Sequence, residues 1–291
     1  KSACGFDCKP GYADCNGVGA DGCESQPASD PNNCGLCGKQ CTGKCVNGAC
    51  ECSGTSASAT PIPLDMYVML DKSGSMLQVV SGAQTRWDIV KSSLGTFFGS
   101  PSSKGITVGL QYFPLQDPNG TSCDDNYYYS PAVAMGVLPG TGNAQVNALT
   151  QSMANTTPVG GTPTNGALKA ALKYASDYKK LVPTHTVVVV LATDGEPGDG
   201  CGATIANSAA EAMTGASGNP KIPTYVIGVG SNLTNLDTIA AAGGTSKAFI
   251  VNDGSADAFI AALKSIQLKA VGCEYAVPTP PNGGTVDPTK V

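Results

Sequence analysis

The sequence predicts an α/β fold, with a doubly wound, mainly parallel six-stranded sheet, one antiparallel edge strand and a small disulfide-rich N-terminal module. Residues 66–70 and 187–192 are unbroken apolar runs, which are typical of strands buried on both faces of a parallel sheet. Helical and strand patterns alternate after position 64, as in right-handed βαβ units. Ten of the 13 cysteines lie between Cys4 and Cys52, and this density indicates disulfide bonds.

The charge and hydropathy of the chain argue against two classes of partner. Charged residues make up 13% of the 291 residues, and the formal net charge is -5. The clustered Lys and Arg that neutralise phosphates are absent, so we expect no nucleic-acid partner. No segment approaches the roughly 18 apolar residues of a membrane span, and the chain begins without a signal-like apolar region, as expected of a mature or trimmed form.

Residues 1–52 form the predicted disulfide-stapled module, which fits an oxidising compartment. Its stretches DCNGVGADGCE and NCGLCGKQC resemble the Cys-rich repeats of myxobacterial surface proteins. A zinc site is the alternative, because four cysteines have metal-like spacing, but the segment contains no His to complete a mixed site. These four are Cys34, Cys37, Cys41 and Cys45.

The same module offers a few side-chain oxygens to Ca²⁺. Their spacing misses the EF-hand pattern, because Val18 stands where Asp or Asn is needed. Roles in turns are therefore favoured over a calcium site. The residues concerned are Asp14, Asn16, Asp21 and Glu24.

A linker and the first elements of the larger domain follow. Residues 53–63, SGTSASATPIP, are small, polar and interrupted by proline, which predicts a linker. After the first strand, apolar residues recur at helical intervals over 86–98. Residues 106–113 alternate in polarity, and 132–138 is the predicted hairpin partner that lies antiparallel at the sheet edge.

The second half continues the alternation and ends in a tail. The domain spans 64–272, and the Pro- and Gly-rich residues 273–291 are a tail or the start of a further module. The remaining predicted strands are 224–229 and 248–251, and the predicted helices are 143–154, 165–180, 233–242 and 256–268, with one more after 187–192.

Polar side chains follow the two central strands where each one ends. Asp71, Ser73 and Ser75 follow the first, and Asp194 follows the second. The carboxyl ends of parallel strands meet at one edge of the sheet, so two carboxylates and two hydroxyls converge there. Carboxylate repulsion is relieved by a divalent cation, and hard oxygens suit Mg²⁺ or Mn²⁺. The alternative is that the two Asp residues only cap the helices that follow.

Three motifs together resemble the metal-ion-dependent adhesion site (MIDAS) of von Willebrand factor type A domains, also called integrin I domains. They are Asp71-x-Ser73-x-Ser75, Thr162 within GGTPT, and Asp194 within TDGE, and the resemblance runs from 64 to 272. It implies that these five residues hold Mg²⁺, or Mn²⁺ or Ca²⁺ in its place. It also implies that the hydroxyls bind directly while the Asp residues act partly through water, so that a partner's acidic side chain can occupy an open position.

The expected topology predicts two disulfides and a set of residues that border the metal-bearing edge. The loops after 106–113 and 187–192 share the metal-bearing edge, so a Cys123–Cys201 disulfide is geometrically reasonable. Cys52 and Cys273 belong at the opposite edge, where a bond between them is predicted to restrain sliding of the last helix. Either pairing leaves an odd cysteine. The candidate ligand-binding rim is Asp124, Asp125, Tyr127, Tyr128, Tyr129 and Glu196, although some of the tyrosines must face the hairpin's own core.

The leading function is adhesion to a protein or extracellular-matrix ligand that presents an acidic side chain. Such a protein is secreted or lies on a bacterial cell surface. In the second case, a part of the protein outside this sequence could anchor it in the outer membrane. The alternatives are a structural scaffold of a surface assembly with a structural metal, and a metal-dependent hydrolase. We expect no enzyme, because the single histidine, His185, lies at the far end of its strand and the Gly-x-Ser-x-Gly and Walker motifs are missing.

Overall fold

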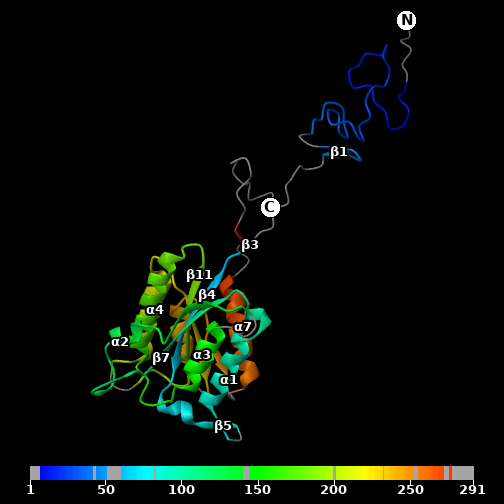
Figure 1. Ribbon diagram of the computed structural model, residues 1–291. Coiled ribbons are helices and arrows are strands. Elements are labelled where there is room, and N and C mark those ends of the chain that lie inside the picture. The colour runs from blue at the N-terminus through cyan, green and yellow to red at the C-terminus, as the bar shows by residue number, and fades with distance from the viewer. Residues whose placement is uncertain are drawn as a thin grey trace. The chain divides into compact units, whose positions relative to one another are not determined.

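A computed structural model describes residues 7–41, 44–50, 60–81, 83–139, 144–198, 201–231, 233–251, 255–271 and 275–276. The chain divides into two compact units, one formed by Lys1–Ala59 with Pro278–Val291 and the other by Thr60–Val277. The second unit contains the sheet and its helices (Figure 1). Among the described residues, none of the helices combines the length and apolar character that a bilayer crossing requires.

The central sheet has six strands in the order β10-β7-β4-β11-β12-β13. Only the β10–β7 pair is antiparallel, and the other four pairs are parallel. This confirms the predicted mainly parallel sheet with one antiparallel edge strand. The bounds are β4 Leu64–Asp71, β7 Thr107–Phe113, β10 Val133–Val137, β11 Thr186–Thr193, β12 Thr224–Val229 and β13 Phe249–Val251.

Helices cover both faces of the sheet, so the fold is doubly wound. Apolar residues of α1, α3 and α7 pack on one face, and those of α4, α5 and α6 pack on the other. Because β4 is covered on both sides, all eight of its residues are buried, which explains the unbroken apolar run over 66–70. The helices are α1 Arg86–Phe98, α2 Asn126–Tyr129, α3 Ala144–Ala154, α4 Thr164–Leu181, α5 Ile205–Ser217, α6 Leu236–Ala242 and α7 Ala256–Val271.

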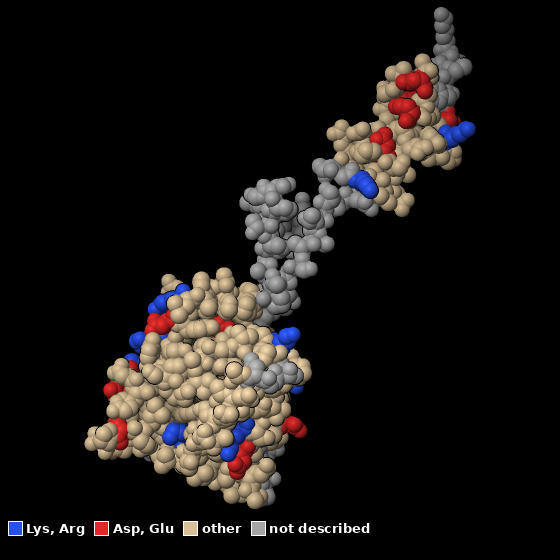
Figure 2. Space-filling model, viewed as in Figure 1, with Lys and Arg blue, Asp and Glu red and all other residues tan. Residues whose placement is uncertain are grey.

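Short elements complete this unit. One of them involves the predicted linker and tail, because β3 (Thr60–Pro61) pairs antiparallel with β14 (Tyr275–Ala276). On the face visible in Figure 2, charged side chains are scattered among uncharged ones, as expected from the low charged fraction. The other short elements are the hairpins β5 Val79–Ser81 with β6 Gln84–Thr85 and β8 Gln116–Asp117 with β9 Gly120–Thr121, and the 3₁₀ helices η1 Gly74–Leu77 and η2 Pro101–Ser103.

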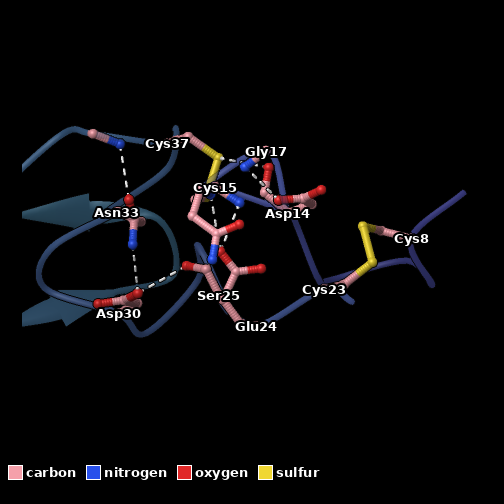
Figure 3. The surroundings of a disulfide bond; sticks show 12 residues. Cys8, Asp14, Cys15, Gly17, Cys23, Glu24, Ser25, Asp30, Asn33 and Cys37 are labelled. Carbon is pink, nitrogen blue, oxygen red and sulfur yellow. Dashed lines mark hydrogen bonds between the residues drawn. A yellow bond between two sulfur atoms is a disulfide. The ribbon is translucent and has the colours of Figure 1, made fainter. Parts of the chain in front are cut away.

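The N-terminal unit is a disulfide-rich module with one small hairpin, β1 (Cys45–Val46) and β2 (Ala49–Cys50). The cysteines of its described residues are joined in pairs, and Figure 3 shows two of these pairs. All four cysteines of the zinc alternative take part in disulfides, so none of them offers the thiolate that zinc requires. The pairs are Cys8–Cys23, Cys15–Cys37, Cys34–Cys45 and Cys41–Cys50.

Acidic side chains of this module accept hydrogen bonds from backbone N–H groups within the module. Glu24 Oε1 accepts hydrogen bonds from the backbone N–H groups of Cys15 and Asn16, both at 3.0 Å. Asp14 Oδ1 accepts from the N–H of Gly17 at 2.7 Å (Figure 3). The Asp14 contact has the turn-forming role that the sequence favours over a calcium site, and the Glu24 contacts join two parts of the loop that are distant in sequence.

Candidate metal centre

Asp71 ends β4 and lies fully buried at the carboxyl edge of the sheet. Its Oδ1 accepts a hydrogen bond from the N–H of Ser73 at 2.7 Å, and its Oδ2 accepts from Thr193 Oγ1 at 2.6 Å. Thr193 is the last residue of the neighbouring strand β11. The two central strands therefore end side by side and fix this carboxylate between them.

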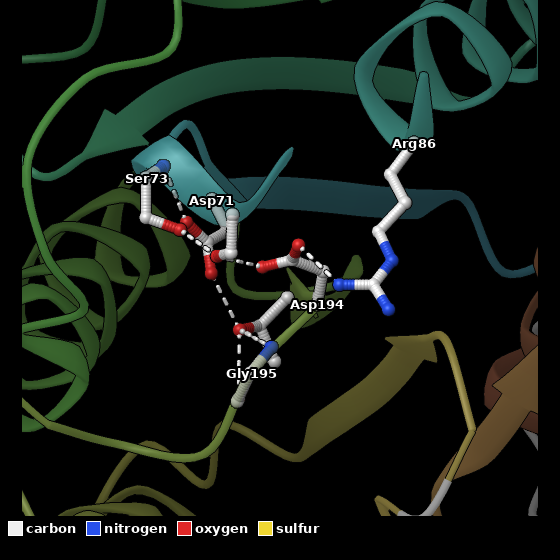
Figure 4. Close-up of polar contacts among 7 residues, drawn as sticks. Asp71, Ser73, Arg86, Asp194 and Gly195 are labelled. Atoms are coloured by element: carbon white, nitrogen blue, oxygen red, sulfur yellow. Dashed lines mark hydrogen bonds and ion pairs between the residues drawn. The ribbon is translucent and has the colours of Figure 1, made fainter. Parts of the chain in front are cut away.

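Two serine hydroxyls connect Asp71's loop to the second carboxylate. The Oγ atoms of Ser73 and Ser75 are 2.9 Å apart, and Ser75 Oγ donates to Asp194 Oδ1 at 2.8 Å (Figure 4). Ser73 is buried whereas Ser75 is exposed, so this cluster opens to solvent on the side of Ser75. Four of the five predicted ligands thus form one hydrogen-bonded group.

The fifth, Thr162, lies in a loop that is fastened to the same edge. The N–H of Gly74 donates to the carbonyl of Gly160 at 2.9 Å, which ties this loop to the serine loop. A Cβ built on Gly195 would lie 3.9 Å from Thr162 Oγ1. Thr162 is therefore beside the residue that follows Asp194. We name the five residues Asp71, Ser73, Ser75, Thr162 and Asp194 the MIDAS set.

The electrostatics of this set favour a cation. Burial, and then repulsion from Asp194, raise the pKa of Asp71 to about 7, although hydrogen bonds from Thr193 and Ser73 act in the opposite direction. A carboxylate that is kept protonated near neutral pH is one that lacks a positive partner. All the side chains of the set offer hard oxygen atoms, which fits Mg²⁺, Mn²⁺ or Ca²⁺ and not a thiophilic metal.

Arg86 is a further residue of this edge, and the sequence motifs did not identify it. Its Nη1 lies 2.9 Å from Asp194 Oδ2, and the side chain is only 13% exposed (Figure 4). An arginine at the start of a predicted helix gives no signal by itself, because such a residue is ordinarily solvated. The sequence therefore did not predict that a positively charged side chain lies next to Asp194.

Part of the predicted rim lies near this edge. Cys123 and Cys201 form a disulfide with an S–S distance of 2.04 Å, and the carbonyl oxygen of Cys123 is 3.8 Å from a Cβ built on Gly166 in the first turn of α4. Asp124, Tyr127 and Glu196 are exposed. Asp125 forms an ion pair with Lys169 of α4 at 3.0 Å, and Asn235 Nδ2 donates to Glu196 Oε1 at 2.6 Å.

Two of the predicted rim tyrosines make contacts within the domain. Tyr128 is completely buried, and its hydroxyl donates to the carbonyl of Ser122 at 2.6 Å. Tyr129 packs edge-on against Tyr174 in the middle of α4, with 5.8 Å between ring centroids. Successive residues of the short helix α2 point about 100° apart, so neighbouring tyrosines face different surroundings.

Two further sequence predictions concern the other end of the sheet. Cys52 and Cys273 lie outside the described residues, so their predicted bond stays a prediction. His185 precedes β11 and lies at the amino end of the sheet, where its Nδ1 is 2.8 Å from Asp65 Oδ2. The histidine is therefore remote from the MIDAS set.

Structural comparison finds adhesin and pilin structures with the same fold. The pilus adhesin SpaC from Lactobacillus rhamnosus GG matches with a TM-score of 0.53 and 16% identity, over 72% of this chain and 30% of that one. The minor pilin PilB from Streptococcus sanguinis matches with a TM-score of 0.53 and 14% identity, over 73% of this chain and 62% of that one. This chain thus spans less than two thirds of either protein.

Sequence comparison identifies the family of the larger unit. No curated protein matches the chain. The family model of the von Willebrand factor type A domain matches residues 65–267, which include every member of the MIDAS set, and the chain belongs to this family.

Proposed function

We propose that this protein is a metal-dependent adhesion or ligand-binding protein of the cell surface or extracellular space. Asp71, Ser73, Ser75, Thr162 and Asp194 would hold Mg²⁺, with Mn²⁺ or Ca²⁺ as substitutes. The partner would be a protein or matrix component that presents an acidic side chain. The observation that carries the proposal is the pair of buried carboxylates bridged by serine hydroxyls at the open edge of the sheet.

The residues of the set have distinct tasks in this proposal. Asp71 and Asp194 supply negative charge, and the hydroxyls of Ser73, Ser75 and Thr162 supply neutral oxygens. A bound divalent cation would supply an electrophilic position that accepts a carboxylate oxygen from a partner. Since Ser75 is exposed, the approach for such a partner is from its side.

Two other observations support a surface or secreted protein. Five disulfides among the described residues fit an oxidising compartment. The structural neighbours are by name a pilus adhesin and a minor pilin, which suggests attachment as the role of this fold here too. We further propose that the protein performs no catalysis, because the single histidine is remote from the MIDAS set.

Calorimetry with matched variants tests the proposal. Mg²⁺ is titrated into metal-free wild-type protein, Asp71→Ala, Thr162→Ala and the control Asp177→Ala, whose carboxylate is 39% exposed and paired with Lys173 and Lys180. We expect binding in the wild type and the control, no binding in Asp71→Ala, and weakened binding in Thr162→Ala. Equal binding in all four proteins would exclude the MIDAS set as the metal site.

A second experiment separates adhesion from a purely structural metal. Immobilised wild-type protein is exposed to extracellular-matrix proteins in Mg²⁺ or in EDTA, with Thr162→Ala in parallel. An adhesion protein retains a partner only in Mg²⁺ and less well after the substitution. Metal binding without any retained partner would favour the scaffold, and turnover of a substrate would favour the hydrolase.

A further inference from the structure

Arg86 places a permanent positive charge against one carboxylate of the MIDAS set. The Asp194 carboxylate is divided between two partners, since its Oδ1 accepts from Ser75 and its Oδ2 pairs with Arg86 at 2.9 Å (Figure 4). The Asp194 side chain is 0% exposed, so this ion pair is largely removed from water. A guanidinium does not lose its proton in proteins. Asp194 is therefore compensated at every working pH.

The fold holds this arginine from two directions. Arg86 is the first residue of α1, and Thr85 and Asp88 form a capping box that fixes the start of the helix. On the other side, a Cβ built on Gly230 would lie 2.8 Å from Arg86 Nη2 and 3.1 Å from its Cζ. Gly230 has a φ of +132°, which favours glycine, so the backbone after β12 leaves the space that the guanidinium fills.

Two other carboxylates near this edge, those of Asp88 and Glu196, have partners of their own. Asp88 binds Thr85 and lies 3.4 Å from Lys91, and Glu196 binds Asn235. Arg86 Nη1 pairs with Asp194 Oδ2, whereas Arg86 Nε has no hydrogen-bond partner among the described residues. The two carboxylates of the set are thus unequal, because Asp194 has a cationic neighbour and Asp71 has hydroxyl and amide donors.

We propose that Arg86 is a positioning residue that sets the metal affinity of the MIDAS set. This inference rests on the proposed function. In metal-free protein, Arg86 compensates Asp194 and keeps the buried carboxylate in place. Toward a divalent cation the same charge is repulsive, so it weakens metal binding. The two carboxylates of Asp71 and Asp194, the Arg86 guanidinium and a divalent cation together carry one net positive charge. A metal-filled site therefore favours an acidic partner.

Charge-matched variants test this role. Arg86→Gln removes the charge, Arg86→Lys keeps it, and Lys91→Gln removes one charge from the same helix at a site paired with Asp88. Calorimetry with Mg²⁺ and with Mn²⁺ alone should show a Kd about tenfold lower for Arg86→Gln, and values within about threefold of wild type for the other two. Thermal unfolding should show that metal-free Arg86→Gln is less stable than wild type and gains more from metal.

The outcomes distinguish this inference from the proposed function. A folded Arg86→Gln variant whose metal affinity equals or falls below that of wild type overturns the role of Arg86. So does an Arg86→Gln variant that stays unfolded at saturating Mn²⁺, because the arginine would then be required for the fold itself. Absence of metal binding by the wild-type protein would instead overturn the proposed function.

Discussion

Strand β4 carries a buried aspartate at each end, and the two have opposite surroundings. Asp65 at the amino end is paired with His185 at 2.8 Å, and its Oδ1 has no hydrogen-bond partner among the described residues. Asp71 at the carboxyl end receives hydrogen bonds from Ser73 and Thr193 and is repelled by a second carboxylate. Both are completely buried.

The difference shows what decides whether a buried carboxylate needs an ion from solution. At Asp65 the neighbouring ionisable side chain is a histidine, whose Nδ1 lies 2.8 Å from Asp65 Oδ2. At Asp71 the neighbouring ionisable group has the same sign, so hydrogen bonds alone cannot remove the repulsion. We therefore expect only the carboxyl end of β4 to respond to divalent metal.

The largest expected effect is on stabilisation by Mg²⁺. At a concentration about 1,000 times its Kd, a ligand that binds only the folded protein stabilises it by about 4.1 kcal/mol. Asp71→Asn should abolish this gain, and Asp65→Asn should retain it, because the second aspartate takes no part in the MIDAS set. Thermal unfolding with Mg²⁺ and with EDTA measures both. If both variants lost the stabilisation by Mg²⁺, the two ends of β4 would not differ in their response to metal.

The second effect is a pH dependence of the metal-free protein. The pKa of Asp71 is raised to about 7 in the folded protein from its ordinary value of 3.8, so between these two values the folded protein keeps a proton that the unfolded chain has lost. The contribution of Asp71 to the free energy of unfolding should therefore be greatest below about pH 4. It should fall by a few kcal/mol at most as the pH rises to about 7.

Urea unfolding in EDTA at about pH 5 and about pH 8 measures this fall. The Asp71→Asn variant is the control, because it has no carboxyl at this position and should lose this contribution to the slope. Mg²⁺ should reduce the fall in wild-type protein, since the ion replaces the proton. If the free energy of unfolding changes equally with pH in the wild type and in Asp71→Asn, ionisation of Asp71 does not destabilise the folded protein.

Sequence patterns predicted the sheet and the MIDAS set for a clear physical reason. Apolar continuity identified β4 and β11, and strand ends in a parallel sheet must meet at one edge. The contact of Arg86 with Asp194 was missed because it depends on how α1 is oriented over the sheet. Tyr128 was misplaced because residues in an unrecognised helix such as α2 point in different directions. The β3–β14 pair lies in Pro-containing segments whose pattern resembles a linker.

The third effect concerns His185. Its removal in His185→Ala leaves Asp65 buried without its partner, and breaking a buried pair in this way costs about 3 kcal/mol or somewhat less, because the histidine is 29% exposed and water can enter. Mg²⁺ should not restore the loss. Urea unfolding measures it, with His185→Gln as a control that keeps a hydrogen-bonding group. A loss that Mg²⁺ reverses would mean that the two ends of β4 are coupled.

The smallest effect is expected at Asp177, a partly exposed carboxylate with more ionic partners than either buried aspartate. Asp177 binds Lys180 at 2.9 Å and Lys173 at 3.0 Å, and these contacts lower its pKa to about 2. A lowered pKa stabilises the fold above the unfolded value of 3.8, and this contribution is lost as pH falls toward about 2. Water screens the side chain, which is 39% exposed, so Asp177→Asn should cost less than about 1 kcal/mol.

Salt provides the check on this last prediction. The small loss in Asp177→Asn should shrink further in about 1 M salt, where the Debye length is about 3 Å, whereas the loss in His185→Ala should change little. Urea unfolding of both variants at low and high salt makes the comparison. Equal losses at Asp177 and His185 would show that the number of ionic partners, and not burial, decides the energetic weight of a carboxylate in this fold.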